Sequence, residues 1–232
     1  MSQITWDEFK VDVLHELYDN QFERGLYIFR GQSCAEWGLV SSFDRLFHNR
    51  KLSNQMLTNF KELCENYDLC DTKILADEAK LLALGQHFGL PTRLLDWSYS
   101  PYIAAFFAFN DIYSNNDDNE HVAIWCLKCN EIFEQNELLE IVKVKQAGNF
   151  RIRNQDGAFT LLKSLLYDDL SIFLDEKHPN ILRKYIISKS EAEFAIKDLD
   201  AMGINNIRIY PDLSGASLHI KLMNYFEDKK NL

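Results

Sequence analysis

The chain has 232 residues, of which 47% are hydrophobic and sixteen are Phe, so it can bury a sizeable core. Its 25 basic and 35 acidic residues give a formal net charge of −10, which disfavours broad non-specific binding to nucleic acid or to anionic membranes. The N-terminal residues are charged throughout, and no apolar run approaches the roughly 18 residues of a membrane span. The sequence therefore predicts a cytoplasmic protein without signal peptide, anchor or membrane partner.

The N-terminal segment predicts a helix over residues 5–18. Thr5 is a favourable N-cap, and Glu8 completes a capping box. Apolar residues then recur at helical spacing, at Phe9, Val13, Leu14 and Leu17. The next apolar run, LYIFRGQS at residues 26–33, is typical of a strand that ends at Gly31, which places Arg30 at a strand end.

Helices are predicted between residues 41 and 83. A short one begins at a cap, Ser41 or Ser42. A longer one, from Asn54, carries Phe60, Leu63 and Tyr67 on one face, and after a break near residues 70–72 a second helix runs to Ala83.

The stretch LGQHFGLPTRLLDWSYSPYIAAFFAF, residues 84–109, combines dense polar chemistry with an apolar helix. Gly89 and Pro91 predict a loop with a short extended or single-turn piece over residues 86–97. Ser100 as N-cap and Pro101 at the first helical position then predict a central helix buried on all sides.

After a polar loop at residues 110–120, the sequence alternates strands and helices. We expect strands at 121–128 and 138–145 that pair in one sheet, and a strand at 150–156 that ends in a turn at Gly157. A helix near 160–167, a mobile polar stretch to 180, a strand at 182–188 and a helix from Ser190 closed by Gly203 follow. The segment 207–226 predicts a last strand, a turn and a final helix. The result is a single domain over 1–232, of the α+β class, with mixed or antiparallel small sheets, a buried central helix and an N-terminal helical portion.

The five cysteines do not predict a disulfide framework, because their number is odd and no secretory signal accompanies them. Cys126 and Cys129 form a C-x-x-C that leads from a strand into a turn, without a second ligand pair at zinc spacing. We therefore expect reduced thiols and no metal.

Polar residues at predicted strand ends and loops are candidates for a ligand site. Arg30 and Arg93 either bind an anion or tie loops down by pairing with Asp96 and Asp212. His87, a lone histidine, is more often a hydrogen-bonded core residue than a catalyst. The candidates from this reasoning are Arg30, Gln32, Gln86, His87, Arg93, Asp96, Ser98, Gln155 and Asp212. No Walker loop, G-x-G-x-x-G, G-x-S-x-G or H-E-x-x-H is present.

Two motifs resemble the FRG domain family, named for its Phe/Tyr-Arg-Gly triplet. They are Phe29-Arg30-Gly31-Gln32 and the dodecapeptide QHFGLPTRLLDW, residues 86–97, and the likeness extends over about residues 20–220. Ser98 stands where the family usually has Thr, and Ser214 where an acidic residue is common. The family occurs mainly in bacteria and phages and has no established activity, so the resemblance names no reaction. A role in bacterial or phage conflict systems belongs to the first hypothesis below.

A fainter resemblance is to ADP-ribosyltransferases of the Arg-Ser-Glu type. Arg30 matches their strand-end Arg, and Trp97-Ser98-Tyr99-Ser100 is similar to their Ser-Thr-Ser segment. This resemblance implies an NAD cofactor, with Arg30 on a phosphate, Ser98 on the nicotinamide ribose and Trp97 over the ring. Gln155 lies at the place of the third element, but an amide cannot supply the charge of the family's catalytic Glu.

Two hypotheses follow. The first is a nucleotide-using transferase or NAD glycohydrolase, in which Arg30, Ser98 and Gln155 or a carboxylate act on the ligand, with a protein as a conceivable target. The second is a non-catalytic module that recognises a nucleotide or another phosphorylated ligand.

Overall fold

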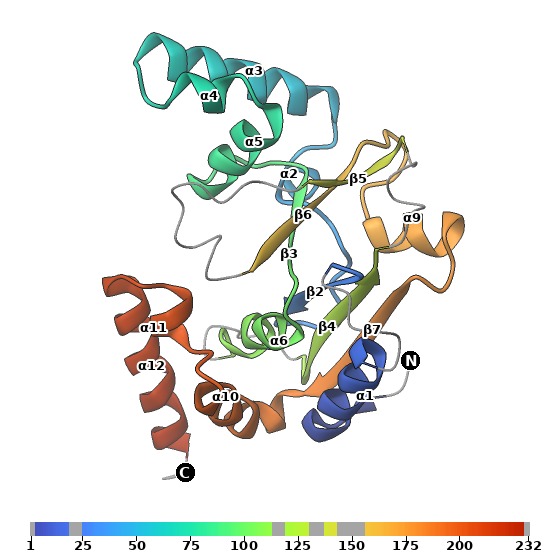
Figure 1. Ribbon diagram of the computed structural model, residues 1–232, viewed down its shortest axis with the longest axis vertical. Coiled ribbons are helices and arrows are strands. Elements are labelled where there is room, and N and C mark those ends of the chain that lie inside the picture. The colour runs from blue at the N-terminus through green and yellow to red at the C-terminus, as the bar shows by residue number, and fades with distance from the viewer. Residues whose placement is uncertain (1–2, 19–24, 113–118, 130–136, 143–155, 230–232) are drawn as a thin grey trace.

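The computed structural model describes residues 3–18, 25–112, 119–129, 137–142 and 156–229. Its strands form one mixed sheet in the order β1-β7-β4-β2-β3-β6-β5 (Figure 1). Among these strands only β1 and β7 run parallel, and the other neighbours are antiparallel. The strands are β1 (Gln3–Ile4), β2 (Tyr27–Gln32), β3 (Leu94–Ser98), β4 (His121–Lys128), β5 (Leu139–Val142), β6 (Gly157–Leu162) and β7 (Leu182–Ser188). The predicted α+β class is confirmed.

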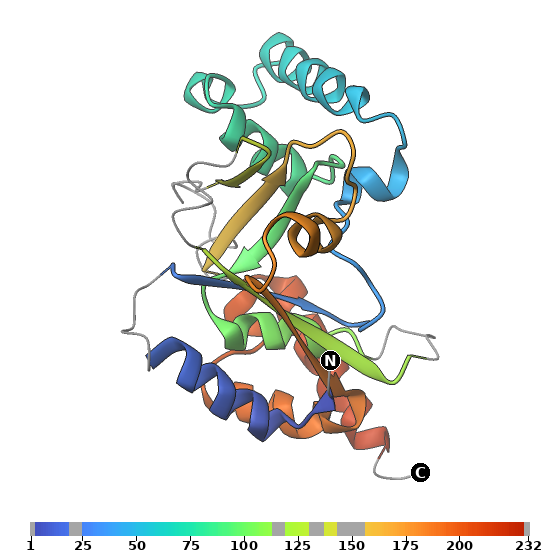
Figure 2. The ribbon, with the colours of Figure 1, turned by 90° about the vertical axis from the view of Figure 1, so that its right-hand side faces the viewer.

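Helices surround this sheet on both faces and at one end. They are α1 (Trp6–Tyr18), α2 (Ser42–Leu46), α3 (Lys51–Asn66), α4 (Thr72–Leu75), α5 (Glu78–His87), α6 (Pro101–Phe109), α9 (Leu170–Lys177), the 3-10 helix η1 (Lys189–Glu191), α10 (Ala192–Ala201), α11 (Asn206–Ile209) and α12 (Leu213–Lys229). Figure 2 shows α3, α4 and α5 at the end of the molecule opposite α1 and α10. No described helix has the length and apolar character needed to cross a bilayer.

Several helix starts agree with the capping chemistry of the sequence. The Thr5 amide donates to the Glu8 carboxylate at 2.7 Å and the Glu8 amide to the Thr5 hydroxyl at 3.2 Å, which completes the predicted capping box. Ser41 caps α2, and Ser100 caps α6 by accepting the Ile103 amide hydrogen at 3.3 Å. These contacts depend on a few neighbouring residues, which is why sequence predicts them.

The predicted boundaries around the polar motifs need correction. β2 continues to Gln32, so Arg30 lies within the strand instead of at its end. The second helix of the 54–83 region is two helices, α4 and α5, and α5 extends through Gln86 and His87 before Gly89 ends it with φ +89°. The end of the expected loop is the strand β3.

The C-terminal half departs further from the sequence prediction. β4 and β5 belong to one sheet but are not neighbours, because β2, β3 and β6 separate them. Gly157 begins β6 instead of a turn, and the helix expected near 160–167 is wrong, since β6 is held between β3 and β5. The polar stretch before residue 180 contains α9, and the last predicted strand is α11, which Asn205 caps. At β6, tertiary pairing outweighs local propensity.

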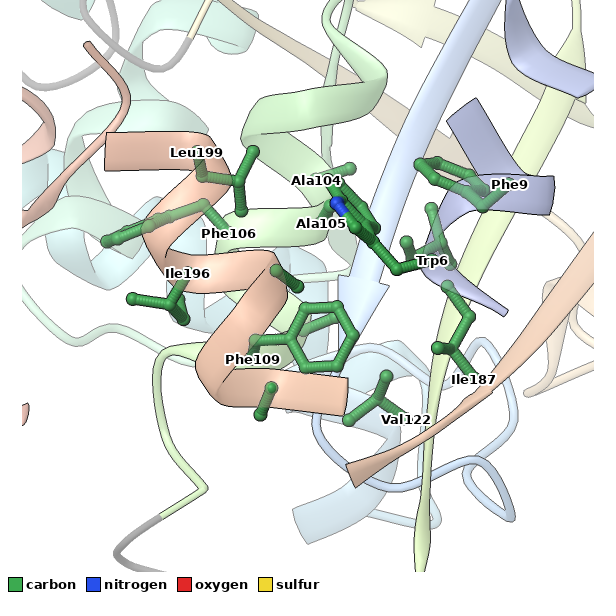
Figure 3. Packing of buried hydrophobic residues seen from close by; sticks show 14 of the residues in the cluster. Trp6, Phe9, Ala104, Ala105, Phe106, Phe109, Val122, Ile187, Ile196 and Leu199 are labelled. Atoms are coloured by element: carbon green, nitrogen blue, oxygen red, sulfur yellow. The ribbon is translucent and has the colours of Figure 1, made fainter. Parts of the chain in front are cut away.

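The largest core cluster lies on one face of the sheet, where α6 is enclosed by α1 and α10. Figure 3 shows Phe106 and Phe109 of α6 beside Ile196 and Leu199 of α10, with Trp6 and Phe9 on the other side. Six residues of α6 are buried, so the predicted central helix is confirmed. A second cluster, with Trp97, Trp125 and Phe173, fills the opposite face beneath α9.

Not every predicted apolar stripe faces the core. In α1, Phe9 and Val13 are fully buried, but Leu14 of the same predicted stripe is exposed. The predicted stripe of α3 is also partly exposed, at Leu63 and Tyr67. Helical spacing identifies a common face, but the elements that cover it are fixed only by the tertiary arrangement.

The pairing of β2 with β3 is much shorter than the pairing of β2 with β4. β2 and β3 share one registered pair, Phe29 with Ser98, whereas β2 and β4 share six, from Tyr27 to Gln32. The candidate site lies beside this single registered pair, at Arg30 of β2 and Asp96 of β3.

Candidate functional site

A pocket of about 300 Å³ lies beside the short pairing of β2 with β3. Arg30 from β2, Asp96 from β3 and Gln86 from the last turn of α5 line it together. The further lining residues are Ser42, Arg45 and Leu46 from α2, Gly89, Leu90 and Pro91 from the following loop, and Leu94 and Leu95. Three of the residues selected from the sequence therefore meet in one cavity.

The Phe29-Arg30-Gly31 triplet places the arginine by alternation along β2. Phe29 is buried in the α6 core, and Gly31 lies so close to α6 that a Cβ would come within 1.9 Å of the Ala104 carbonyl oxygen. Between them, the Arg30 guanidinium crosses the gap to β3 and donates from Nη1 to the Asp96 backbone carbonyl at 2.7 Å. The side chain thus makes a contact to β3 at a position where β2 and β3 have no registered pair.

The charge of Arg30 is incompletely compensated. Its side chain is 18% exposed, and its Nε atom is buried without a hydrogen-bond partner among the described residues. The nearest carboxylate oxygen, Oδ2 of Asp96, is 3.8 Å from Nη1, beyond hydrogen-bonding distance. Desolvation lowers the pKa of Arg30, with the Asp96 charge opposing this shift and the Arg45 charge adding to it. A cation in this state favours a ligand that brings negative charge.

The Asp96 carboxylate lies in the pocket and is held by the dodecapeptide itself. Gln86 Nε2 donates to Oδ1 at 2.7 Å, and the Thr92 hydroxyl donates to the other end of the Gln86 amide, Oε1. The Asp96 side chain is 61% accessible to solvent. The protein around the pocket nevertheless restricts its solvation, and this desolvation raises the pKa of Asp96, while Arg30 and the Gln86 hydrogen bond act to lower it.

Arg93 does not belong to this pocket. It is 8% exposed, with Nε 3.4 Å from the Asp44 carboxylate and Nη2 donating to the Ser164 carbonyl at 2.9 Å. Asp44 also accepts from Arg50 Nε at 3.1 Å. This buried cluster ties α2 to β3 and to the segment after β6, so Arg93 has the loop-fastening role that was the alternative to anion binding.

Three further candidates are structural. Ser98 is 3% exposed in β3 and accepts the Ser100 amide hydrogen at 3.0 Å. Trp97 is buried on the face of the sheet opposite α6, and its Nε1 donates to the Thr160 hydroxyl at 2.9 Å. Gln32 accepts from Trp125 at 2.6 Å and donates to the Gly38 carbonyl at 3.0 Å. None of them lines the pocket.

The remaining candidates lie away from the pocket. His87 is exposed and packs edge-on against Phe88, with ring centroids 5.0 Å apart. Asp212 accepts the Ser214 and Gly215 amide hydrogens at 2.9 and 3.2 Å at the start of α12. The described ion pairs of Arg30 and Arg93 are with Asp96 and Asp44, in place of the suggested pairing with Asp212. Gln155, with Arg151 and Arg153, lies outside the described residues.

Sequence reasoning missed Arg45 and Ser42 as site residues. Arg45 is exposed at the pocket, four positions after the Ser41 cap, and its Nη1 donates to the Val40 carbonyl at 3.3 Å. Ser42 exchanges hydrogen bonds with the Thr92 backbone, accepting at 3.2 Å and donating at 3.1 Å. The sequence signal that could have identified these two residues is the polar start of α2, which lies in the chain between the arginine triplet and the dodecapeptide.

The fold and pocket define an α+β protein whose arginine triplet and dodecapeptide build one cationic pocket. A family model for the FRG domain matches residues 25–117, which contain both motifs. This part of the chain is an FRG domain, and the match covers less than half of the chain. Neither the curated proteins nor the solved structures gave a significant match.

Proposed function

We propose that the pocket recognises a small phosphorylated ligand of the nucleotide class, with the phosphate at Arg30 and Arg45. The observation that carries this proposal is the state of Arg30, a largely buried guanidinium that bonds a backbone carbonyl and, within the described part of the chain, has no carboxylate at hydrogen-bonding distance. A phosphate could accept from the guanidinium and from Arg45, which lines the same pocket.

The proposal favours recognition over group transfer. Ser98, the residue assigned to the ribose of NAD by resemblance, is buried in β3 and engaged by the Ser100 amide. A pocket without that hydroxyl lacks one part of the Arg-Ser-Glu arrangement. Under this reading the FRG domain is a sensor or adaptor, and its role in bacterial or phage conflict rests on the family resemblance.

An NAD-using transferase or glycohydrolase remains a second candidate because of Asp96. Its carboxylate is 3.8 Å from Arg30 Nη1, and it supplies a negative group beside the arginine that Gln155 could not supply. A carboxylate in such a position can stabilise positive charge that develops on a ribose during nicotinamide loss.

Calorimetric titration with inorganic phosphate tests recognition, and nicotinamide release from NAD tests transfer. We expect inorganic phosphate to bind the wild type and to bind Arg30→Ala at least about tenfold more weakly, as expected for one lost charge-assisted contact. His87→Ala is the matched control, since His87 is exposed and does not line the pocket. Equal binding to wild type and Arg30→Ala would contradict the proposal, whereas nicotinamide release that requires Asp96 would establish the second candidate.

A further inference from the structure

We propose that the phosphorylated ligand carries a ribose with a free 2-hydroxyl, and that Asp96 reads the vicinal hydroxyls of this sugar. The inference rests on the proposed function, because phosphate binding at Arg30 is what brings a sugar to Asp96. It goes further by assigning a second polar subsite and a sugar class.

The first step is the direction of the hydrogen bonds behind Asp96. The Thr92 oxygen accepts the Leu94 amide hydrogen at 3.3 Å, and its own hydrogen goes to Oε1 of Gln86. This contact fixes the orientation of the Gln86 amide, so that Nε2, a donor, faces Asp96 at 2.7 Å. Ser42 and the Phe43 amide hold the Thr92 carbonyl at 3.1 Å each. The chain therefore presents Asp96 to the pocket as an acceptor.

The second step is the unused capacity of the carboxylate. Oδ1 accepts from Gln86, and the carboxylate also accepts from the backbone amide of Asp96 itself, while the Arg30 nitrogen nearest to Oδ2 stands 3.8 Å away, too far for a hydrogen bond. The side chain is 61% exposed, and Asp96 lines the pocket. An ionised carboxylate has about four acceptor sites, so Asp96 keeps capacity for two adjacent hydroxyls that donate to it.

The third step is exclusion by charge. A second phosphate at Asp96 would meet a like charge, whereas a neutral donor would not. The cations Arg30 and Arg45 and the acceptor Asp96 therefore line one pocket, with Asp96 Oδ2 3.8 Å from Arg30 Nη1. A sugar phosphate matches this combination, because it has one anionic end and hydroxyl donors on the ring.

The fourth step is size. At about 300 Å³ the pocket lies at the small end of the range for ligand sites, roughly 300–1,000 Å³. One sugar phosphate or mononucleotide suits this volume better than a complete dinucleotide. Leu46, Leu90 and Pro91 add an apolar wall against which a base could pack.

The test compares ribose 5-phosphate with 2-deoxyribose 5-phosphate, which differ in the 2-hydroxyl, by ligand-observed NMR titration at neutral pH. We expect the wild type to prefer the ribose compound by about tenfold, the equivalent of one hydrogen bond to a charged group. In Asp96→Ala the preference should fall to within about twofold. Thr92→Val, which removes the hydroxyl with little change of shape, should weaken the preference by releasing the Gln86 amide. Melting temperatures of both variants establish that the fold persists.

The outcomes separate this inference from the proposed function. Equal affinity of the wild type for both sugars, with both lost in Arg30→Ala, would overturn sugar recognition and leave phosphate recognition intact. Failure of both sugars and of inorganic phosphate to bind would overturn both proposals. If Thr92→Val and Asp96→Ala fold and keep the full preference for ribose, Asp96 is not the reader and the inference is wrong.

Discussion

Gly31 and Ala104 are in such close contact that a Cβ on Gly31 would lie 1.9 Å from the Ala104 carbonyl oxygen and 2.6 Å from the Ala108 nitrogen. Both obstacles are backbone atoms of α6, which cannot rotate away as a side chain could. The glycine of the triplet therefore sets the distance between the central helix and β2, and with it the position of the neighbouring Arg30.

Gly31→Ala should destabilise the protein by about 3 kcal/mol or more, because the added methyl must push α6 from the sheet in the largest core cluster. Urea unfolding followed by circular dichroism measures the loss. Gly89→Ala is the matched control, since a Cβ added there would have no described atom within 4 Å apart from its chain neighbours, and the φ of +89° is what opposes the substitution. We expect about 1–2 kcal/mol there. Equal losses at the two glycines would refute the close-contact argument.

The alanine variants of Arg30 and Arg93 should lose different amounts of unfolding free energy. Arg93→Ala removes the hydrogen bond to the Ser164 carbonyl. It also removes a positive charge beside the Asp44 carboxylate, whose side chain is only 4% exposed. We expect a loss of about 3–5 kcal/mol, typical of breaking a buried ion pair. Arg30→Ala should cost less than about 1.5 kcal/mol, since one hydrogen bond is lost and an incompletely paired cation is removed. Chemical denaturation of both variants decides this, and the reverse order of stability would contradict the assigned roles.

The contact between α1 and α10 predicts a stability change with pH. Asp198 accepts from Lys10 Nζ at 2.6 Å and from Trp6 Nε1 at 2.8 Å, and these hydrogen bonds lower the pKa of Asp198 below its usual value. A carboxyl whose pKa is lower in the folded state stabilises the protein above its unfolded pKa, and this contribution is lost as pH falls through the folded value.

Asp198→Asn should therefore reduce the free energy of unfolding at neutral pH by about 1.5–3 kcal/mol. The difference from wild type should shrink as pH falls below roughly 4, the ordinary pKa of an Asp. Urea unfolding at a series of pH values measures both. A difference that stays constant down to pH 3 would show that the charge of Asp198 is not responsible.

Anion binding in the pocket should also depend on pH through Asp96. Arg30, Arg45 and Asp96 are the charged residues that line the pocket, and desolvation raises the pKa of Asp96. Protonation of Asp96 on acidification removes a negative charge beside the site. The affinity for sulfate, which does not titrate in this range, should rise by about tenfold as pH falls through that pKa. Asp96→Asn should bind sulfate with little pH dependence, and an unchanged pH profile in this variant would assign the effect to another group.

Local chemistry in the sequence predicted the helix starts and the motif residues of the pocket. The capping residues Thr5, Ser41 and Ser100 act over three or four positions, so they are readable from the printed order of residues. The helix expected at 160–167 and the last expected strand were wrong, because β6 is fixed by pairing with β3 and β5 and α11 by its Asn205 cap. Such pairing joins residues far apart in the chain.

The sequence by itself determined that this chain contains the FRG triplet and dodecapeptide and that Ser100-Pro101 begins a buried helix. It could not separate Arg30 from Arg93, since both are arginines beside polar motif residues. Only the tertiary structure decided that Arg93 meets Asp44 in a buried cluster and that Arg30 spans the opening between β2 and β3. The physical reason is that the role of a charged side chain depends on its solvation and on its partners, and folding supplies both from distant segments.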